Sequence, residues 1–363
     1  MRGLTRREGI GQGWMERKAE IRKNITKTQK GIEVGPWFSP LAPKQEGYNC
    51  LSLDVFDTET LRERAKTDPL VADDKVPFIE SVDLIGTATA IDQIVEERGE
   101  LGTFDYIISS HNFEHSPNPI KFLKGCGRVL KPGGFLSMAI PDKRACFDYF
   151  RPHTTLAQWI EAFFADRERP SFTQVFEHTS LHSRFRVGDE LQAGFTLSED
   201  PRNVCAAESL RQGYEAWVSL EATRDPTYYD THCSIFTPSS FRLLLSDAAF
   251  LGLSPLGVEE VSKANGNEFY VHLRNAGYHA YTEEETAQHY AARQQLLHAI
   301  GDECSYNSLA LYDARKSIQE LEQQVAQLQA CINNVLLPLN WKAKLLDPLR
   351  RLKRGICKVV HSD

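Results

Sequence analysis

Four histidines of the sequence could move a proton. Histidine changes its charge nearest neutral pH, so it is the natural general base when an enzyme must take a proton from a hydroxyl group. The candidate bases are His111, His178, His182 and His232. His111 directly follows an apolar run, and the other three lie in a long aromatic-rich segment. That segment lacks carboxylates or thiolates at close metal-ligand spacing, so the sequence predicts no metal site.

A glycine and an acid stand where a nucleoside could bind. Gly35 ends an apolar run, and the lack of a Cβ there lets the backbone approach a ligand closely. Asp54 ends the next run about 20 residues later, the distance at which an acid accepts both hydroxyls of an adenosine ribose. An NAD-binding fold has the same pair, and so can an ordinary turn followed by a surface acid. The pair alone leaves these alternatives open.

Short apolar runs alternate with helical segments from Gly31 onward, which predicts an α/β fold with a doubly wound sheet. The expected parallel strands are 31–36, 49–55, 81–85, 104–110 and 135–141. Ligands bind at the carboxyl ends of strands in such a sheet. Asp54 and His111 are therefore expected at the same edge.

Helices and a hairpin are expected around these strands. Apolar residues at helical spacing predict a helix over 118–130, and Lys-Pro-Gly-Gly at 131–134 ends it. A second helix is expected from Thr237 to about Leu251. After it, two strands joined by an Asn-Gly turn at 265–266 predict an antiparallel pair that closes the sheet.

Residues 104–143, FDYIISSHNFEHSPNPIKFLKGCGRVLKPGGFLSMAIPDK, resemble class I S-adenosylmethionine (SAM)-dependent methyltransferases. In that family a strand, a Glu-His pair, a helix and a Lys-Pro-Gly-Gly turn follow in this order. With GIEVGP at the start, the resemblance covers 31–143, and the closing hairpin extends it to about 275. GIEVGPWFSPLAPK, AIPDKRACFDYFRP and YYDTHCSIFTPSSF look like a bacterial type 11-like subgroup. Members of that subgroup often occur with, or fused to, glycosyltransferases of surface-polysaccharide assembly.

The resemblance implies a Rossmann-like fold, SAM as cofactor and a defined cofactor site. The implied cofactor-binding residues are Glu33, Gly35, Pro36, Asp54, Thr87, Ser109 and Ser110. Glu33 and Gly35 would shape the loop under the methionine part of SAM, and Asp54 would hold the ribose. The two serines and His111 would lie beside the amino-acid end of SAM and the transferred methyl group.

Three further positions follow from the same resemblance. Glu114 and His115 are expected to fix the turn and the helix that follows. Thr87 takes the place of an adenine-contacting Asp, and a hydroxyl cannot supply the same charge-assisted acceptor. The usual Gly-x-Gly is replaced by Gly-Pro-Trp-Phe-Ser-Pro at 35–40.

The domain organisation follows from composition. Residues 1–14 are arginine-rich with little apolar periodicity and are expected to be disordered. The methyltransferase domain is expected over 15–280, beginning with a charged helix over 15–30. Residues 143–236 form an irregular, aromatic-rich stretch, expected as a helical insertion over the carboxyl edge.

Residues 285–335 are helical in pattern and predict a coiled coil. Apolar residues alternate three and four apart through four heptads, at Leu311, Ala314, Ile318, Leu321, Val325, Leu328, Ile332 and Val335. Mostly β-branched a positions with central Leu at d favour a parallel two-stranded coiled coil, hence a homodimer. A single amphipathic helix packed on the domain is the alternative.

The tail over 338–363 is short and basic. Within 341–358 it has seven Lys and Arg against one Asp, beside an apolar side. This pattern favours peripheral contact with an anionic membrane, and a disordered tail or one docked on a partner glycosyltransferase is the alternative.

Bulk properties exclude several classes of protein. The formal net charge of −7 argues against a nucleic-acid binder. No apolar run approaches the ~20 residues needed to cross a bilayer, and no secretory signal is present. Eight cysteines without a Cys-x-x-Cys pair predict reduced thiols and a cytoplasmic protein.

Two functional hypotheses follow. The first is an enzyme that methylates a sugar hydroxyl of a surface glycan or of its lipid-linked precursor. The second is a catalytically silent methyltransferase-like scaffold in a glycan-assembly complex, which the altered glycine loop favours and the retained Glu33 and Asp54 oppose. An NAD-dependent enzyme is disfavoured because Gly-x-Gly-x-x-Gly is absent from the sequence.

Overall fold

The computed structural model describes residues 15–69, 71–305 and 308–334. These form two compact units. The first holds the described residues up to Glu199 together with Val204–Ile300, and the second holds Asp200–Asn203 and the described residues from Gly301 onward. The predictions of a disordered segment over 1–14 and of a basic tail over 338–363 lie outside the described residues.

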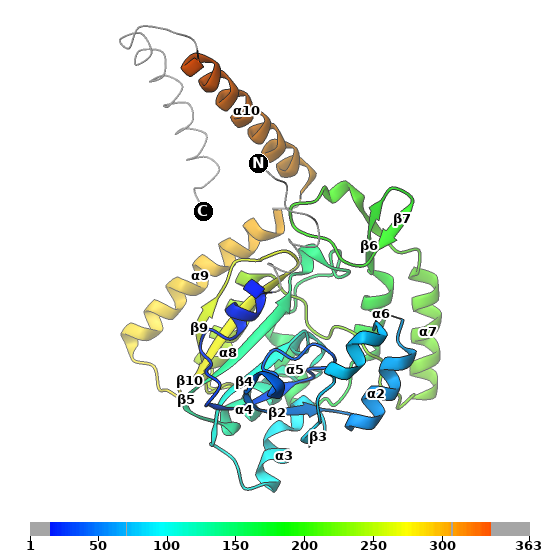
Figure 1. The fold of residues 1–363 in the computed structure, drawn as a ribbon, viewed down its shortest axis with the longest axis vertical. Helices are drawn as coiled ribbons and strands as arrows, with labels where there is room; N and C mark the ends of the chain where they lie inside the picture. Colours follow the sequence, from blue (N-terminus) through cyan, green and yellow to red (C-terminus); the bar gives the residue numbers. More distant parts are fainter. Residues whose placement is uncertain (1–14, 70, 306–307, 335–363) are drawn as a thin grey trace. The chain divides into compact units, whose positions relative to one another are not determined.

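A seven-stranded sheet is the centre of the first unit, in the order β3-β2-β1-β4-β5-β10-β9 (Figure 1). The strands are β1 (Lys30–Val34), β2 (Asn49–Asp54), β3 (Leu84–Ile85), β4 (Phe104–Ser110), β5 (Leu130–Pro141), β9 (Leu256–Val261) and β10 (Glu268–Asn275). The first five pair in parallel, whereas β10 is antiparallel to β5 and to β9. The predicted α/β sheet with five parallel strands and a closing antiparallel pair is confirmed.

Helices and turns connect the strands. The helices around the sheet are α2 (Thr58–Thr67), α3 (Ile91–Glu97), α4 (Pro119–Val129), α8 (Pro238–Phe250) and α9 (Glu283–Ser305). Short 3-10 helices are η1 (Lys44–Glu46), η2 (Asp73–Phe78), η3 (Ala88–Ala90), η4 (Phe113–His115), η5 (Lys143–Ala145) and η6 (Pro201–Asn203). Both predicted helices, α4 and α8, are present with bounds close to those expected.

The core has a layer on each face of the sheet because alternate strand residues point to opposite faces. On one face Ile107 and Met138 pack with apolar residues of α3, α4 and α8. On the other face Tyr106 packs with Ile21 and Leu41, from the N-terminal segment and the loop after β1. The layers hold the strand ends rigidly in place, which a site at those ends requires.

The Lys-Pro-Gly-Gly segment lies inside β5 instead of before it. The pairing of β4 with β5 jumps from Phe104–Leu130 to Tyr106–Phe135, so the extra residues bulge out of the ladder. Gly133 has φ +79°, a conformation that favours glycine. The side-chain amide of Asn275 donates to the carbonyls of Gly127 and Leu130 at 2.9 Å each, which holds the bulge.

The charged helix expected over 15–30 is shorter than predicted. Helical structure covers residues 15–21, and the chain then turns before β1 begins at Lys30. Ile21 and Ile25 are both buried in the second core layer. Packing of these two side chains stops the helix, because burial outweighs the helical preference of a charged sequence.

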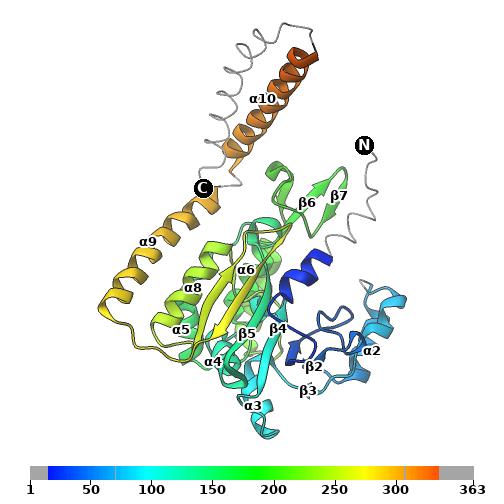
Figure 2. The same ribbon diagram turned by 60° about the vertical axis from the view of Figure 1, so that its left-hand side comes forward.

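The insertion over 143–236 is more regular than expected. It contains three helices, α5 (Leu156–Phe164), α6 (Phe172–Ser180) and α7 (Leu210–Thr223). It also contains a small sheet of β6 (Ser183–Val187), β7 (Glu190–Gln192) and β8 (Val204–Ala206), in the order β7-β6-β8 (Figure 2). Capping boxes start α5 at Thr155 and α6 at Ser171. The helical part was predicted, and the short antiparallel strands were missed because they carry no clear alternation.

The second unit contains α10 (Leu309–Asn334). Within this unit Arg202 lies 3.4 Å from the Asp313 carboxylate and stacks over the Tyr312 ring. Along the predicted heptads Leu321 and Leu328 are about half exposed, whereas Val325 is buried. Val335 lies outside the described residues, and the coiled-coil pairing stays a prediction.

No helix in the described ranges is long and apolar enough to cross a membrane. The seven cysteines that the structure describes are all free thiols.

Candidate active site

A pocket lies beside Asp54 at the end of β2, bordered by α2 and by Trp37 of the loop after β1. Val34 pairs with Leu53, and the Gly35 N–H donates to the Leu53 carbonyl at 2.8 Å, so the two strand ends lie together. A cavity of about 550 Å³ is lined by Trp37, Asp54, Val55, Phe56, Leu61, Arg64, Thr67 and Asp68. Its size and its mixed apolar and polar wall suit a small-molecule ligand. Burial raises the pKa of Asp54 although backbone N–H groups of Phe56 and Val55 act against this.

Glu33 holds the loop that follows β1. Its buried carboxylate accepts hydrogen bonds from the backbone N–H groups of Leu41 and Ala42, at 2.7 and 2.9 Å. Gly35 has φ +60°, which allows the chain to turn sharply into the loop containing Pro36. Burial raises the pKa of Glu33 to about 7. The loop is therefore fixed by an acid from the strand itself, in place of a Gly-x-Gly turn.

The pocket can accept the nucleoside half of SAM. Asp54 lies at the tip of β2 with one carboxylate oxygen bonded to the Phe56 N–H at 3.2 Å. Phe56 and Trp37 provide apolar walls on which an adenine could pack. Thr87 follows the tip of β3 but is exposed and does not line this cavity. Asp54 therefore offers the pocket an acceptor for ribose hydroxyls, whereas Thr87 is not placed in the pocket to hydrogen-bond with the polar edge of adenine.

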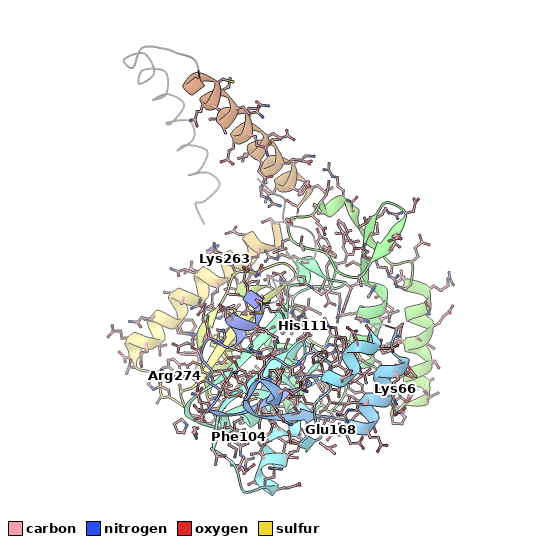
Figure 3. The ribbon with its side chains drawn as sticks, in the orientation of Figure 1. Lys66, Phe104, His111, Glu168, Lys263 and Arg274 are labelled. Carbon is pink, nitrogen blue, oxygen red and sulfur yellow. The ribbon has the colours of Figure 1, made fainter. Side chains whose placement is uncertain are left out.

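His111 marks the tip of β4 (Figure 3). Its backbone has φ +49°, and its N–H donates to the Ala139 carbonyl of β5 at 3.0 Å. Ser109, two residues earlier in β4, is fully buried. The hydroxyl of Ser110 accepts a hydrogen bond from Arg17 at 2.7 Å. The side chain of His111 is 40% exposed, so a ligand at the strand ends can reach it.

Glu268 orients the imidazole of His111. Nε2 of His111 lies 2.7 Å from Oε2 of Glu268. The other carboxylate oxygen, Oε1, accepts from Nε of Arg17 at 2.7 Å and from the hydroxyl of Tyr270 at 2.8 Å. Burial alone would raise the pKa of Glu268, but His111 and Arg17 lower it to about 2. Desolvation lowers the pKa of His111, and the carboxylates of Glu268 and Glu114 outweigh it and raise the pKa overall. The ionised carboxylate of Glu268 thus fixes the orientation of the His111 ring. A histidine that acts as a general base is commonly oriented in this way.

A second imidazole–carboxylate pair lies close by. Nδ1 of His232 lies 2.5 Å from Oδ2 of Asp148, and Arg151 donates to the other oxygen of Asp148 at 2.9 Å. Burial would raise the pKa of Asp148, but His232 and Arg151 lower it to about 2. Glu114 lies between the two pairs, with Oε1 3.7 Å from Nδ1 of His111 and 4.0 Å from Nε2 of His232.

His178 and His182 lie deeper in the insertion. With His232 they surround Phe147, whose ring centroid is 5.4, 5.2 and 4.7 Å from those of His178, His182 and His232. Burial lowers the pKa of His178 to about 4 and also lowers the pKa of His182. Of the four candidate bases, His111 and His232 therefore flank Glu114, and the other two pack around an aromatic ring.

The sequence argument missed four partners of these histidines. Glu268 and Asp148 stand 157 and 84 positions along the chain from the imidazoles that they contact, and Arg17 contacts Glu268 from 251 positions away, so no local signal marks them. Glu114 was visible in the Glu-His pair but was assigned to the turn. The turn is instead held by backbone bonds and by Asn118, whose side chain accepts from the Lys121 N–H.

A mostly parallel α/β sheet with a pocket beside the carboxyl end of β2 is the arrangement of ligand-binding α/β proteins. A methyltransferase-domain family model matches residues 29–253, more than half of the chain. The chain therefore belongs to this methyltransferase family, and it is a SAM-dependent methyltransferase. No curated protein sequence matches the chain.

Solved structures with distant similarity were also found. A SAM-dependent methyltransferase from Thermotoga maritima is 19% identical over 36% of this chain and 53% of its own, with a TM-score of 0.26. A SAM-dependent methyltransferase from Methanosarcina mazei is 13% identical over 70% of this chain and 96% of its own, with a TM-score of 0.34. The trans-methyltransferase CalH in complex with SAH is 14% identical over 71% of this chain and 54% of its own, with a TM-score of 0.33.

Proposed function

We propose that this methyltransferase transfers its methyl group to a hydroxyl of a sugar, in a surface glycan or in its lipid-linked precursor. The observation that carries the hydroxyl acceptor is the imidazole of His111, held by Glu268 at 2.7 Å and 40% exposed at the tip of β4. A hydroxyl must lose a proton when it is methylated, and an oriented imidazole is suited to take it.

SAM supplies a methyl group on a sulfonium, which is activated for direct in-line displacement. Asp54, at the end of β2, would bind the ribose hydroxyls, and Gly35, with φ +60°, would let the backbone of the loop approach the methionine part. His111 donates through Nε2 to Glu268, which leaves Nδ1 to accept the proton of the hydroxyl. Glu268 stabilises the imidazolium that results, because Arg17 and Tyr270 keep its carboxylate fixed and ionised.

A sugar acceptor is supported by the insertion. A cavity of about 780 Å³ lies between the connection from α5 to α6 and the end of α7. Arg167, Glu168, Arg169, Arg224 and Tyr228 are among its lining residues. Such a polar wall suits a hydrated ligand with many hydroxyls or a phosphate, as a glycan precursor would be. The resemblance to a glycosyltransferase-associated subgroup supports the same class of acceptor.

A scaffold without catalysis is the second candidate, and the altered loop at 35–40 favours it. In this alternative the chain contributes surfaces to a glycan-assembly complex that includes a glycosyltransferase. Homodimerisation through α10 and contact of the basic tail with the cytoplasmic face of a membrane belong to both candidates. Calorimetry separates them, because an enzyme binds SAM and a silent scaffold does not.

The acceptor is tested with isotope-labelled SAM, purified full-length protein and glycans extracted from cells that lack the gene. Mass spectrometry is expected to find a labelled methyl ether on a sugar of the extract. The His111→Ala variant is the matched control and should leave the extract unlabelled. Label found only on nitrogen-containing or protein acceptors would overturn the proposed function.

A further inference from the structure

The buried carboxylate of Glu114 has no hydrogen-bond partner among the described residues, and imidazole nitrogens of His111 and His232 lie 3.7 and 4.0 Å from its Oε1. The residue is 0% exposed. Its main chain is held firmly, because its carbonyl accepts from the N–H groups of Cys233 and Ser234 at 2.6 and 3.1 Å. An ionised carboxylate is costly to bury unless it is paired or coordinates a metal. This position therefore indicates a cation that completes the site.

Two imidazoles face the same point. Glu114, His115 and His232 each offer one ligand atom, and these atoms all lie within 4.8 Å of one another. Nε2 of His232 lies 4.0 Å from Oε1 of Glu114. Two ligand atoms bound at about 2.1 Å to a tetrahedral ion are about 3.4 Å apart, which is shorter than this distance by about half an ångström. Modest side-chain rotation would bring all three onto one ion.

Both histidines are oriented as metal ligands usually are. Nδ1 of His232 is bonded to Asp148, and Nδ1 of His115 lies 2.8 Å from Oδ1 of Asp230. Histidines that bind metals generally donate their other ring N–H to a carboxylate, which fixes the tautomer and raises the basicity of the ligand nitrogen. Nε2 of each ring is then the nitrogen left for an ion. This arrangement is independent of the unpaired carboxylate and supports the same conclusion.

We propose that Glu114, His115 and His232 bind one divalent transition-metal ion of the Zn²⁺ class. Two imidazoles and one carboxylate suit such ions, and three protein ligands leave at least one position open. The acceptor hydroxyl takes the open position, a role that rests on the proposed function. Its place is beside the base, because Nδ1 of His111 lies 3.7 Å from Glu114.

The ion lowers the cost of losing the hydroxyl proton, as a Lewis acid does. In the transfer the O–H proton passes to His111 and the oxygen forms a bond to the methyl carbon. The carbon–sulfur bond breaks with its electron pair going to sulfur. Methyl ether, S-adenosylhomocysteine and imidazolium are the products, and the charge of the metal ion does not change.

The test measures metal binding by the full-length protein without SAM or acceptor. Protein freed of metal with a chelator is titrated with Zn²⁺ against a chromophoric competitor. One Zn²⁺ per chain is expected, and Glu114→Gln and His232→Gln should each weaken binding at least 10-fold. Asp148→Asn should weaken it by about 10–100-fold, because it removes the carboxylate that orients His232.

Two control variants and a measurement of melting temperature distinguish loss of the metal site from general damage to the fold. His182→Gln, in the same aromatic cluster, and Cys233→Ser, next to His232, should bind Zn²⁺ as the unchanged protein does. Zn²⁺ should raise the melting temperature of the unchanged protein and leave that of Glu114→Gln where it is. The latter variant folds if its melting temperature without metal is not lowered, which is expected because it removes a buried unpaired charge.

Absence of stoichiometric Zn²⁺ binding would overturn the site, and so would full binding by both Glu114→Gln and His232→Gln. The site and the proposed function can fail separately. A protein that methylates glycans but binds no Zn²⁺ refutes the metal site alone. A protein that binds Zn²⁺ through these residues but methylates no hydroxyl refutes the proposed function alone.

Discussion

Nε2 of His111 lies 2.7 Å from Oε2 of Glu268, although 157 positions separate them in the chain. The contact exists because β10 enters the sheet next to β5, which brings the first residue of β10 to the tip of β4. Glu268 pairs in the ladder with Pro141, the last residue of β5. The base and its orienting acid are thus fixed by two strands of one rigid sheet.

Replacement of the base should reduce turnover more than it reduces affinity for SAM. We expect His111→Ala to lower kcat by about 10²–10⁴-fold, because a base acts in the transition state and not in cofactor binding. Turnover is measured with labelled SAM on extracted glycans, and the dissociation constant of SAM by calorimetry. His279→Ala, which removes an exposed histidine paired with Glu285, is the control. A rate unchanged by His111→Ala would move the base to His178, His182 or His232.

The acid at the tip of β2 should account for much of the affinity for SAM. We expect SAM to bind with micromolar affinity and Asp54→Ala to cost about 1.5–3 kcal/mol per lost charge-assisted hydrogen bond. Glu59→Ala, an exposed acid in the first turn of α2, should bind SAM normally. Calorimetry that detects no SAM binding by the unchanged protein would favour the scaffold.

Stability should fall as the pH rises towards neutrality because of Glu33. The pKa of its carboxyl is about 7 in the folded protein, against an ordinary value of 4.5, since burial favours the neutral form. Between these values the folded state binds more protons than the unfolded state does. This side chain should therefore lower the free energy of unfolding by about 3 kcal/mol as pH rises from 4.5 to 7.

Urea denaturation of the unchanged protein and of Glu33→Gln across this pH range measures the effect. The Gln side chain keeps one acceptor for Leu41 or Ala42 but does not ionise. Two charged side chains also influence the pKa of Glu33: Glu80 raises it and Arg22 lowers it. Both side chains remain in the variant. Parallel pH profiles for the two proteins would contradict the assignment.

The heptads of α10 should make the protein a dimer. Leu321 and Leu328 are 51% and 55% exposed, which leaves apolar surface for a second copy of the helix. Light scattering at tens of micromolar is expected to give twice the monomer mass. Replacing both leucines with Lys should give a monomer, whereas Gln323→Lys on the same helix should not. A monomer mass for the unchanged protein would refute the coiled coil.

The basic tail should bring the protein to anionic membranes. Seven Lys and Arg within 341–358 are expected to attract acidic lipid head groups, and this attraction is screened by salt. Full-length protein should float with vesicles of anionic lipid at low salt and less at high salt. Protein truncated after Pro338 should stay unbound. Equal flotation of both proteins at low salt would refute the membrane role.

Periodicity within short stretches determined much of the fold. The runs at 31–36, 49–55 and 104–110 became β1, β2 and β4, because a strand buried on both faces needs a continuous apolar segment whatever surrounds it. Gly35 and Asp54 could be placed together for the same reason, since neighbouring parallel strands end at one edge. Inside 143–236 the strands are only three to five residues long, and such short segments do not show a recognisable alternation of apolar and polar residues.

What the sequence determined by itself was therefore the α/β class, the order of its strands along the chain, and the position of Gly35 and Asp54 at one edge of the sheet. The tertiary structure alone decided which side chains gather around Glu114. His115 is next to Glu114 in the chain, but His232 and Asp148 reach the same place only because the insertion folds back over β4 and β5. Closing a long loop costs little more than closing a short one, so sequence distance says almost nothing about such contacts. Packing of the insertion, including Phe147 against three histidine rings, selects them.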